Sequence, residues 1–158
     1  MEIKQGYTYH IKDSYFELVQ DSNLMQNREF GKYRPTFFCL RDEKLDLLWM
    51  IPISSKYEKA AAIREKLISN GKPCRGIVLG EFDGRQAAFL IQNMFPIREE
   101  YIDHIHTKNG NPVPVSQKIQ KEIRKNVKKL LALNAKGNVV TFTEINRLKE
   151  IMLSNSPS

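Results

Sequence analysis

The run from Leu47 to Lys56 limits what this chain can fold into more than any other stretch of it. Its first part, Leu47-Leu48-Trp49-Met50-Ile51, is apolar at every position, which predicts a strand buried on both faces. After a proline, Ser54-Ser55-Lys56 places two hydroxyl groups and an ammonium group in consecutive positions. A buried strand that ends in this way holds small polar groups at the edge of a core. A helix is predicted to start there, and a helix N-terminus favours an anion such as phosphate.

A β-hairpin is predicted around this run. Residues 36–41 are strongly β-prone, and a polar turn at 42–44 separates them from the strand at 45–53. Lys32-Tyr33-Arg34 precedes the first strand, whereas Ser54-Ser55-Lys56 follows the second. The start of one strand lies beside the end of its antiparallel partner. The hairpin therefore brings the two polar clusters to the same edge of the sheet.

The rest of the chain alternates between strand-like and helix-like segments. Further strands are expected at 6–11, 75–81, 85–91 and 94–97, and helices at 13–20, 57–70, 98–106, 117–134 and from 141 onwards. Short antiparallel strands, helices in the connections and two helices at the end predict an α+β fold. Strands this short fit a small, partly closed β-barrel better than an open sheet. Residues 1–158 are expected to form a single domain.

Several classes of protein are not expected from the composition. No apolar run reaches the length of a membrane span, about 18 residues. The N-terminal residues Met1–Gln5 form no apolar signal region, so a cytoplasmic protein is expected. Cys39 and Cys74 lie far apart inside apolar runs, as reduced buried thiols do. No Cys/His cluster has zinc-ligand spacing and no glycine-rich loop matches a nucleotide fingerprint, so neither a metal nor a cofactor is expected.

The positive charge of the chain is concentrated on one predicted helix. Between Ser116 and Gly137 there are seven basic residues and one acidic residue, in a chain whose formal net charge is +7. Ser116 is the expected N-cap, and the apolar residues recur every three or four positions, which turns the basic residues to the other face. The basic residues considered as RNA contacts are Lys118, Lys121, Arg124, Lys125, Lys128 and Lys129. Such a face is either simply solvated or a surface for a polyanion, and both interpretations stay open.

The two clusters at the hairpin edge suit the cleavage of RNA without a metal ion. The substrate supplies its own nucleophile, the ribose 2′-OH, and the protein has to hold it in line with phosphorus and stabilise charge on the equatorial oxygens. Lys56 and Arg34 are candidates for that charge stabilisation. Ser54 and Ser55 are candidates for binding the non-bridging oxygens. Tyr33 or a lysine is the candidate for moving protons.

Each of these residues also has a plainer interpretation. Ser55 and Glu58 have the spacing of a capping box, so Ser55 is equally a candidate helix N-cap. Lys56 alone is most often a solvated lysine. His104 and His106 are two residues apart in a predicted helix, where they would face away from each other, and are interpreted as surface residues.

The order of these motifs resembles that of the ToxN/AbiQ/CptN toxins of type III toxin–antitoxin systems, which look like SH3-like, MazF/Kid-type barrels with added helices. The matching pieces cover most of the chain. They are Tyr7-Thr8-Tyr9 before a short helix, Tyr33-Arg34 entering a strand, Ile51-Pro52-Ile53-Ser54-Ser55, the run 88–97 and the basic helix around 119–131. The resemblance implies the same architecture here, a small antiparallel barrel with helical insertions and two C-terminal helices.

The resemblance also implies an activity and a partner. Members of the family are metal-independent endoribonucleases that leave 2′,3′-cyclic phosphate and 5′-hydroxyl ends. Their antitoxin is a small repeat RNA that the toxin processes. This RNA folds into pseudoknots and holds the toxin in a closed protein–RNA assembly. The resemblance thus implies RNA substrates and an RNA antitoxin for this chain.

The family's functional residues fall on positions already singled out. Its serine pair falls on Ser54 and Ser55, and its following lysine falls on Lys56 or on Lys59. In some members a proline precedes that lysine, and this chain has none there. The basic residue that enters the second strand falls on Arg34. Two neighbours complete the set, namely Tyr33 as the functional tyrosine and Lys32 as the alternative cation.

Two other functions stay open from the sequence. A non-catalytic RNA-binding barrel would keep the basic helix but would not need Ser54, Ser55 and Lys56. A MazF-like toxin would have a protein antitoxin in place of an RNA. Neither of these alternatives predicts a membrane partner.

Overall fold

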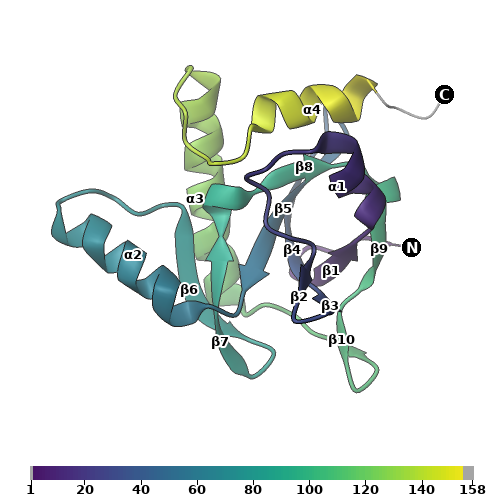
Figure 1. Ribbon diagram of the computed structural model, residues 1–158, viewed down its shortest axis with the longest axis horizontal. Helices are drawn as coiled ribbons and strands as arrows, with labels where there is room; N and C mark the ends of the chain where they lie inside the picture. Colours follow the sequence, from purple (N-terminus) through teal and green to yellow (C-terminus); the bar gives the residue numbers. More distant parts are fainter. Residues whose placement is uncertain (1, 155–158) are drawn as a thin grey trace.

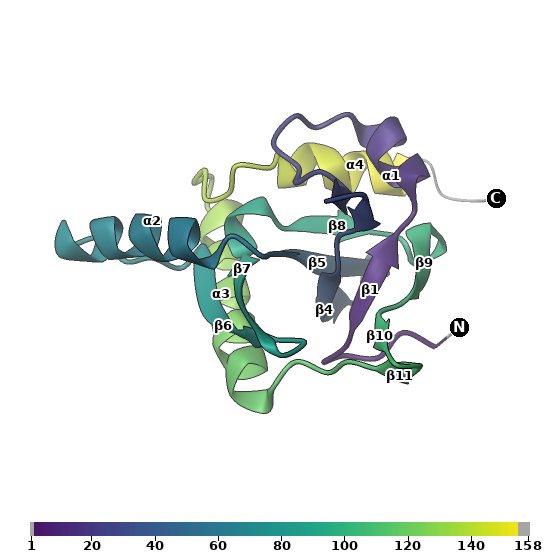
Figure 2. The same cartoon turned by 60° about the horizontal axis from the view of Figure 1, so that its bottom comes forward.

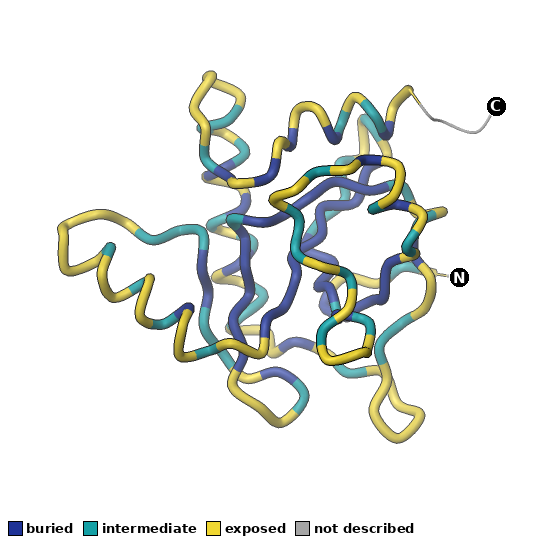
Figure 3. The backbone as a smooth tube through the Cα atoms, viewed as in Figure 1, coloured by how far each residue is buried: buried dark blue, intermediate teal, exposed yellow. Residues whose placement is uncertain are grey.

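The hairpin predicted around residues 36–53 forms the centre of the sheet. In the computed structural model, which describes residues 2–154, β4 (Thr36–Asp42) and β5 (Leu47–Ser54) pair antiparallel (Figure 1). Every residue of β5 is buried, and the strand lies dark blue at the middle of Figure 3. Trp49 and Ile51 pack on one face of the strand, and Leu48 and Met50 pack on the other. Burial on both faces explains why the run is apolar rather than alternating.

The sheet follows the order β6-β7-β5-β4-β1-β9, and β8 also pairs with β5. The bounds are β1 Thr8–Ile11, β6 Ile77–Phe82, β7 Arg85–Leu90, β8 Phe95–Ile97 and β9 Ile102–Ile105. Every pairing in it is antiparallel, which confirms the predicted α+β class. Within residues 2–154 the edge strands β6 and β9 share no ladder, so the sheet is not closed. The likeness to a MazF/Kid-type barrel stays a prediction.

Pro52 stands where β5 changes its partner. Leu48 to Met50 pair with β8, and Ile53 and Ser54 pair with β7 on the same side of the strand. A proline inside a central strand normally removes a ladder hydrogen bond. Here it falls between the two ladders, so its missing N–H leaves neither of them short of a donor.

Residues 2–154 contain four α-helices. They are α1 (Asp13–Val19), α2 (Tyr57–Ser69), α3 (Gln117–Ala135) and α4 (Ile145–Ser154). Figures 1 and 2 show α3 lying across the sheet, α4 beside α1, and α2 projecting away from the body. Ser116 caps α3 as predicted, since its hydroxyl accepts a hydrogen bond from the Ile119 amide at 3.4 Å. None of the helices in residues 2–154 is long and apolar enough to cross a membrane.

The connections contain short elements that were not predicted from the sequence. Two are hairpins of two-residue strands, β2 (Arg28–Glu29) with β3 (Lys32–Tyr33) and β10 (Thr107–Lys108) with β11 (Asn111–Pro112). Two are 3-10 turns, η1 (Ile91–Asn93) and η2 (Glu99–Tyr101). The expected helix at 98–106 is wrong: after η2 the chain continues as β9. Pairing with β1, which sets His10 opposite His104, decides the conformation there.

We expect truncation of an isoleucine to separate a packed helix from a projecting one. Ile123 on α3 is 0% exposed, whereas Ile63 on α2 is 41% exposed. Ile123→Ala should lower the free energy of unfolding by about 3 kcal/mol, because it leaves a cavity under α3. Ile63→Ala should lower it by less than about 1 kcal/mol. Urea unfolding of the two variants measures both values. Equal losses would contradict this division of roles between α3 and α2.

Candidate active site

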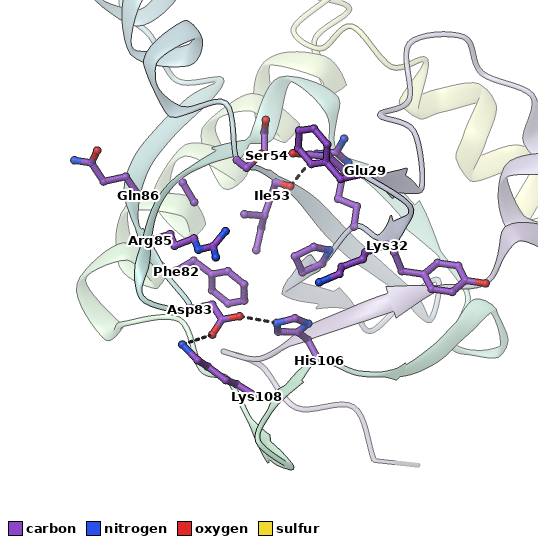
Figure 4. Close-up of a pocket in the computed structure, with 16 residues that line it drawn as sticks. Glu29, Lys32, Ile53, Ser54, Phe82, Asp83, Arg85, Gln86, His106 and Lys108 are labelled. Carbon is purple, nitrogen blue, oxygen red and sulfur yellow. Dashed lines mark hydrogen bonds and ion pairs between the residues drawn. The ribbon is translucent and has the colours of Figure 1, made fainter.

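A pocket of about 510 Å³ lies at the edge where β4 begins and β5 ends (Figure 4). The β2–β3 hairpin, the β6–β7 turn and the segment after β9 form its other walls. Five residues singled out in the sequence line it together, namely Lys32, Tyr33, Arg34, Ser54 and Ser55. The two polar clusters therefore lie together at the edge of the sheet where the predicted hairpin places them.

The two serines are held in different ways. Ser54 is 4% exposed, and its hydroxyl accepts a hydrogen bond from the Lys56 amide at 3.1 Å. The exposed Ser55 donates its hydroxyl to the carboxylate of Glu29 on β2. The capping box of Ser55 with Glu58 is therefore wrong. Helix α2 begins at Tyr57 with Lys56 at the N-cap position, and no side chain caps it there.

Arg34 ties the hairpin to the end of β5. It is 7% exposed, and its Nη1 lies 2.7 Å from Glu29 Oε2 and donates to the carbonyl of Ile53 at 3.0 Å. Its Nε donates to the carbonyl of Gln26. Burial lowers the pKa of Arg34, and the charge of Glu29 opposes that shift. In this arrangement the guanidinium is already paired with a carboxylate, and it fixes the position of the pocket wall.

Tyr33 directs its hydroxyl away from the serines. Arg28 donates to the Tyr33 hydroxyl at 3.0 Å, and the hydroxyl lies 3.4 Å from the carboxylate of Asp13 on α1. The Arg28 guanidinium also lies over the ring, 4.6 Å from its centroid. Lys32, in contrast, is exposed and lies along the pocket (Figure 4).

The candidate lysines Lys56 and Lys59 lie in a second pocket. It measures about 320 Å³, is partly apolar, and contains Ile63 and Phe142 among its walls. Ser54 lines both pockets. Ser54 therefore lies between the two pockets, with Lys32 among the residues that line one and Lys56 and Lys59 among those that line the other.

The basic helix α3 lies apart from both pockets. Its lysines Lys118, Lys121, Lys125, Lys128 and Lys129 are exposed, and Arg124 is half-buried. The opposite stripe, which includes Ile123 and Val127, is packed on the sheet. Within the part of the chain that the structure describes, none of the six basic residues lines either pocket. They form a separate surface.

Three histidine side chains that were not predicted as site residues contact one another in series, and the last of them reaches the pocket. His106 lines the pocket, and its Nε2 lies 3.1 Å from Asp83 Oδ2 (Figure 4). Its Nδ1 lies 2.9 Å from His10 Nε2, and the ring of His10 stacks on that of His104 at 4.5 Å. Residues 102–105 (Ile-Asp-His-Ile) do not alternate between apolar and polar, so no local pattern predicts the pairing with β1 that sets His104 opposite His10. The interpretation of His104 and His106 as an unrelated surface pair is thus incomplete.

The charges around these imidazoles define their proton positions. Burial, together with the nearby His104 and His106, lowers the pKa of His10 to about 4, so its ring is neutral near pH 7. Burial alone would raise the pKa of Asp83, but His106 and Lys108 hold it below its usual value. The ionised Asp83 carboxylate accepts a hydrogen bond from His106 Nε2, and this contact assigns a proton to that nitrogen.

No metal site is apparent in residues 2–154, because no three His, Cys, Asp or Glu side chains there are grouped to hold an ion. Cys39 is buried, which raises the pKa of its thiol to about 12, and Cys74 is half-buried. Neither cysteine forms a disulfide.

The fold has a counterpart among solved structures. No protein-family model and no curated protein matches the sequence. The structure is similar to that of AbiQ, a lactococcal anti-phage endoribonuclease belonging to the type-III toxin-antitoxin system, with a TM-score of 0.68 and 12% sequence identity. The match covers 93% of this chain and 95% of that one. The resemblance to the ToxN/AbiQ/CptN family is therefore confirmed at the level of the fold.

The neutral His10 predicts a loss of stability in acid. Its pKa is about 4 in the folded chain against 6.5 ordinarily, so its contribution is complete above pH 6.5 and is lost as the pH falls toward 4. Between pH 7 and 4.5 this should remove about 2 kcal/mol from the free energy of unfolding. Urea unfolding at both pH values measures the loss, which should be smaller in His10→Gln. The same pH dependence in both proteins would contradict the burial of a neutral His10.

Proposed function

We propose that this chain is a metal-independent endoribonuclease toxin of a type III toxin–antitoxin system. The observation that carries the proposal is the pocket at the end of β5, which Ser54, Ser55 and Lys32 line together. The fold that forms this pocket is similar to that of AbiQ. Residues 1–158 act as one unit in this proposal, in the cytoplasm. The RNA is cut by attack of its own 2′-oxygen on phosphorus. The bond to the 5′-oxygen breaks, and the products are a 2′,3′-cyclic phosphate and a 5′-hydroxyl.

The arrangement of the pocket suggests a role for each side chain. The Ser54 hydroxyl, at the junction of the two pockets, binds a non-bridging oxygen of the scissile phosphate. Ser55 joins it when RNA displaces Glu29. Lys32 on one side and Lys56 or Lys59 on the other stabilise the charge that develops on the phosphorane.

Proton transfer and positioning fall to the remaining residues. The 2′-hydroxyl loses a proton and the 5′-oxygen gains one, and both transfers need a side chain within hydrogen-bond reach. Lys56, which lines the second pocket together with Ser54, is the candidate for this purpose, whereas Tyr33 would first have to release Asp13. Arg34 acts mainly by holding β2 and the end of β5 together.

The exposed face of α3 is proposed as the surface for the antitoxin. Its lysines lie apart from the pockets, so a short substrate in the pocket would not cover them. A folded repeat RNA, such as a pseudoknot, is large enough to contact this face and the pocket at once. Such bridging between copies of the protein would produce a closed protein–RNA assembly.

One observation favours a non-catalytic RNA-binding module instead. Glu29 pairs with Arg34 and also accepts the Ser55 hydroxyl, so a carboxylate occupies part of the space that a phosphate would need. A MazF-like toxin with a protein antitoxin is the third possibility. The next experiment separates cleavage from binding alone.

Purified protein should cleave a mixed RNA in the presence of EDTA and leave cyclic-phosphate ends. Ser54→Ala should slow cleavage about 100- to 1,000-fold, because it removes a donor to the developing charge. Ser14→Ala, which changes an exposed serine on α1, is the matched control and should cleave normally. Gel electrophoresis and end-group mapping provide the readout. RNA that stays intact would contradict the proposed nuclease activity and would favour the non-catalytic RNA-binding module.

The α3 surface should contribute to RNA binding through charge. Replacing Lys121, Lys125 and Lys128 by glutamine should reduce the slope of log K against log salt by about one unit for each phosphate that a lysine no longer neutralises. Fluorescence anisotropy with the antitoxin RNA at several salt concentrations measures this slope. The control replaces three exposed lysines outside α3, namely Lys4, Lys44 and Lys72. An unchanged slope in the α3 variant would mean that this face is only solvated.

A further inference from the structure

The tip of the β2–β3 hairpin has no part in the proposed chemistry or in folding. Only Phe30 and Gly31 connect β2 to β3. Phe30 is 87% exposed, so its ring contributes little apolar burial to stability. It nevertheless lines the first pocket, beside Lys32 and Ser55.

The backbone at this tip is unfavourable for phenylalanine. The φ angle is 53° at Phe30 and 78° at Gly31, so both residues are left-handed. Two-residue turns of this kind prefer Asn, Asp or Gly at the first position. A bulky residue in this region costs on the order of 1 kcal/mol.

The same chain shows what folding alone selects at this kind of turn. The β6–β7 turn is Asp83-Gly84, with φ angles of 54° and 78°. The β10–β11 turn is Asn109-Gly110, with φ angles of 53° and 80°. Three turns thus share one geometry, and only Phe30 departs from the favoured residues. Its presence calls for a reason outside the fold, and strain of this kind concentrates at functional sites.

The surroundings of Phe30 fit a nucleobase. Lys32 and Arg85 line the same pocket and supply positive charge for the phosphates of a nucleic acid, whereas Lys108 is paired there with Asp83. Phe82 adds an aromatic wall, with its ring 5.6 Å from that of His106. Unstacked bases of single-stranded RNA are bound by aromatic side chains of this kind, whereas bases within a duplex are not accessible to them.

The hairpin also holds Phe30 at a fixed place relative to the serines. Glu29, the residue before it, pairs with the buried Arg34. Arg34 in turn donates to Ile53, next to Ser54. A base stacked on Phe30 would therefore keep its register with a phosphate at Ser54.

We infer that Phe30 is a base-stacking residue, which binds one unpaired nucleobase of an RNA whose phosphate lies at Ser54. The inference rests on the proposed function in requiring RNA in this pocket, but it does not require cleavage. It names a contact by which the pocket would select single-stranded over double-stranded RNA. The favoured occupant is RNA rather than an apolar peptide because Lys32 and Arg85, which line the same pocket, can pair with phosphates.

Binding should be measured with a short, fluorescein-labelled single-stranded RNA that carries 2′-methoxy groups in place of its 2′-hydroxyls, so that it cannot be cleaved. Phe30→Ala should weaken binding about 10-fold, because it removes one stacked base. Binding of inorganic polyphosphate, which has charge but no bases, should not change. Val139→Ala, at a residue that is 94% exposed, is the control and should bind RNA normally.

Two further variants separate a binding role from a structural one. Phe30→Asn should raise the unfolding midpoint, because it suits the turn, while it weakens RNA binding. Phe30→Trp should keep the affinity, and RNA should quench its emission. Equal RNA affinity in Phe30→Ala and the parent, an equal loss for polyphosphate, or Phe30→Trp emission unmoved by RNA would overturn the inference. Intact RNA in the cleavage assay would overturn only the proposed nuclease activity. It would leave the inference about Phe30 standing, because the affinity and emission measurements report binding.

Discussion

Burial of β5 on both faces is the constraint on which the rest of the structure depends. The strand contributes residues such as Trp49 to the core under α3 and residues such as Met50 to the core beside α1 and α4. It also pairs with β4, β7 and β8. Because its apolar body is held from all sides, its polar end is delivered to one defined place. Core packing thus determines the position of Ser54, but it does not determine the chemistry of the Ser54 hydroxyl.

Glu29 connects the parts of the candidate site. Its carboxylate pairs with the buried Arg34 and accepts a hydrogen bond from the Ser55 hydroxyl. Glu29 also directly precedes Phe30, whose φ angle is positive. Ion pairs this buried contribute little net stability, because desolvation offsets the attraction. Their value here is geometric, since they fix a two-residue hairpin that has almost no core of its own. An incoming phosphate would compete with that carboxylate for the same partners.

Sequence reasoning succeeded where the determining signals are local. The hairpin of β4 and β5, the Ser116 cap and the Asp83-Gly84 turn all follow from neighbouring residues. It failed where distant partners decide the outcome. Ser55 is no cap because α2 begins at Tyr57, with Lys56 at the N-cap position, and His106 joins His10 only because β1 pairs with β9. The two residues of β2 are too few to show a period, and Phe-Gly is not a usual turn signal.

At Pro52, β5 leaves one set of partners for another. The body of the strand pairs with β4 and β8, whereas Ile53 and Ser54 pair with β7, a strand whose Ala88 and Phe89 are fully buried. The proline therefore joins two antiparallel ladders in a single strand, and Ser54 belongs to the second of them. A substitution that displaces β7 would consequently act on Ser54 through the backbone, at a distance from the pocket itself.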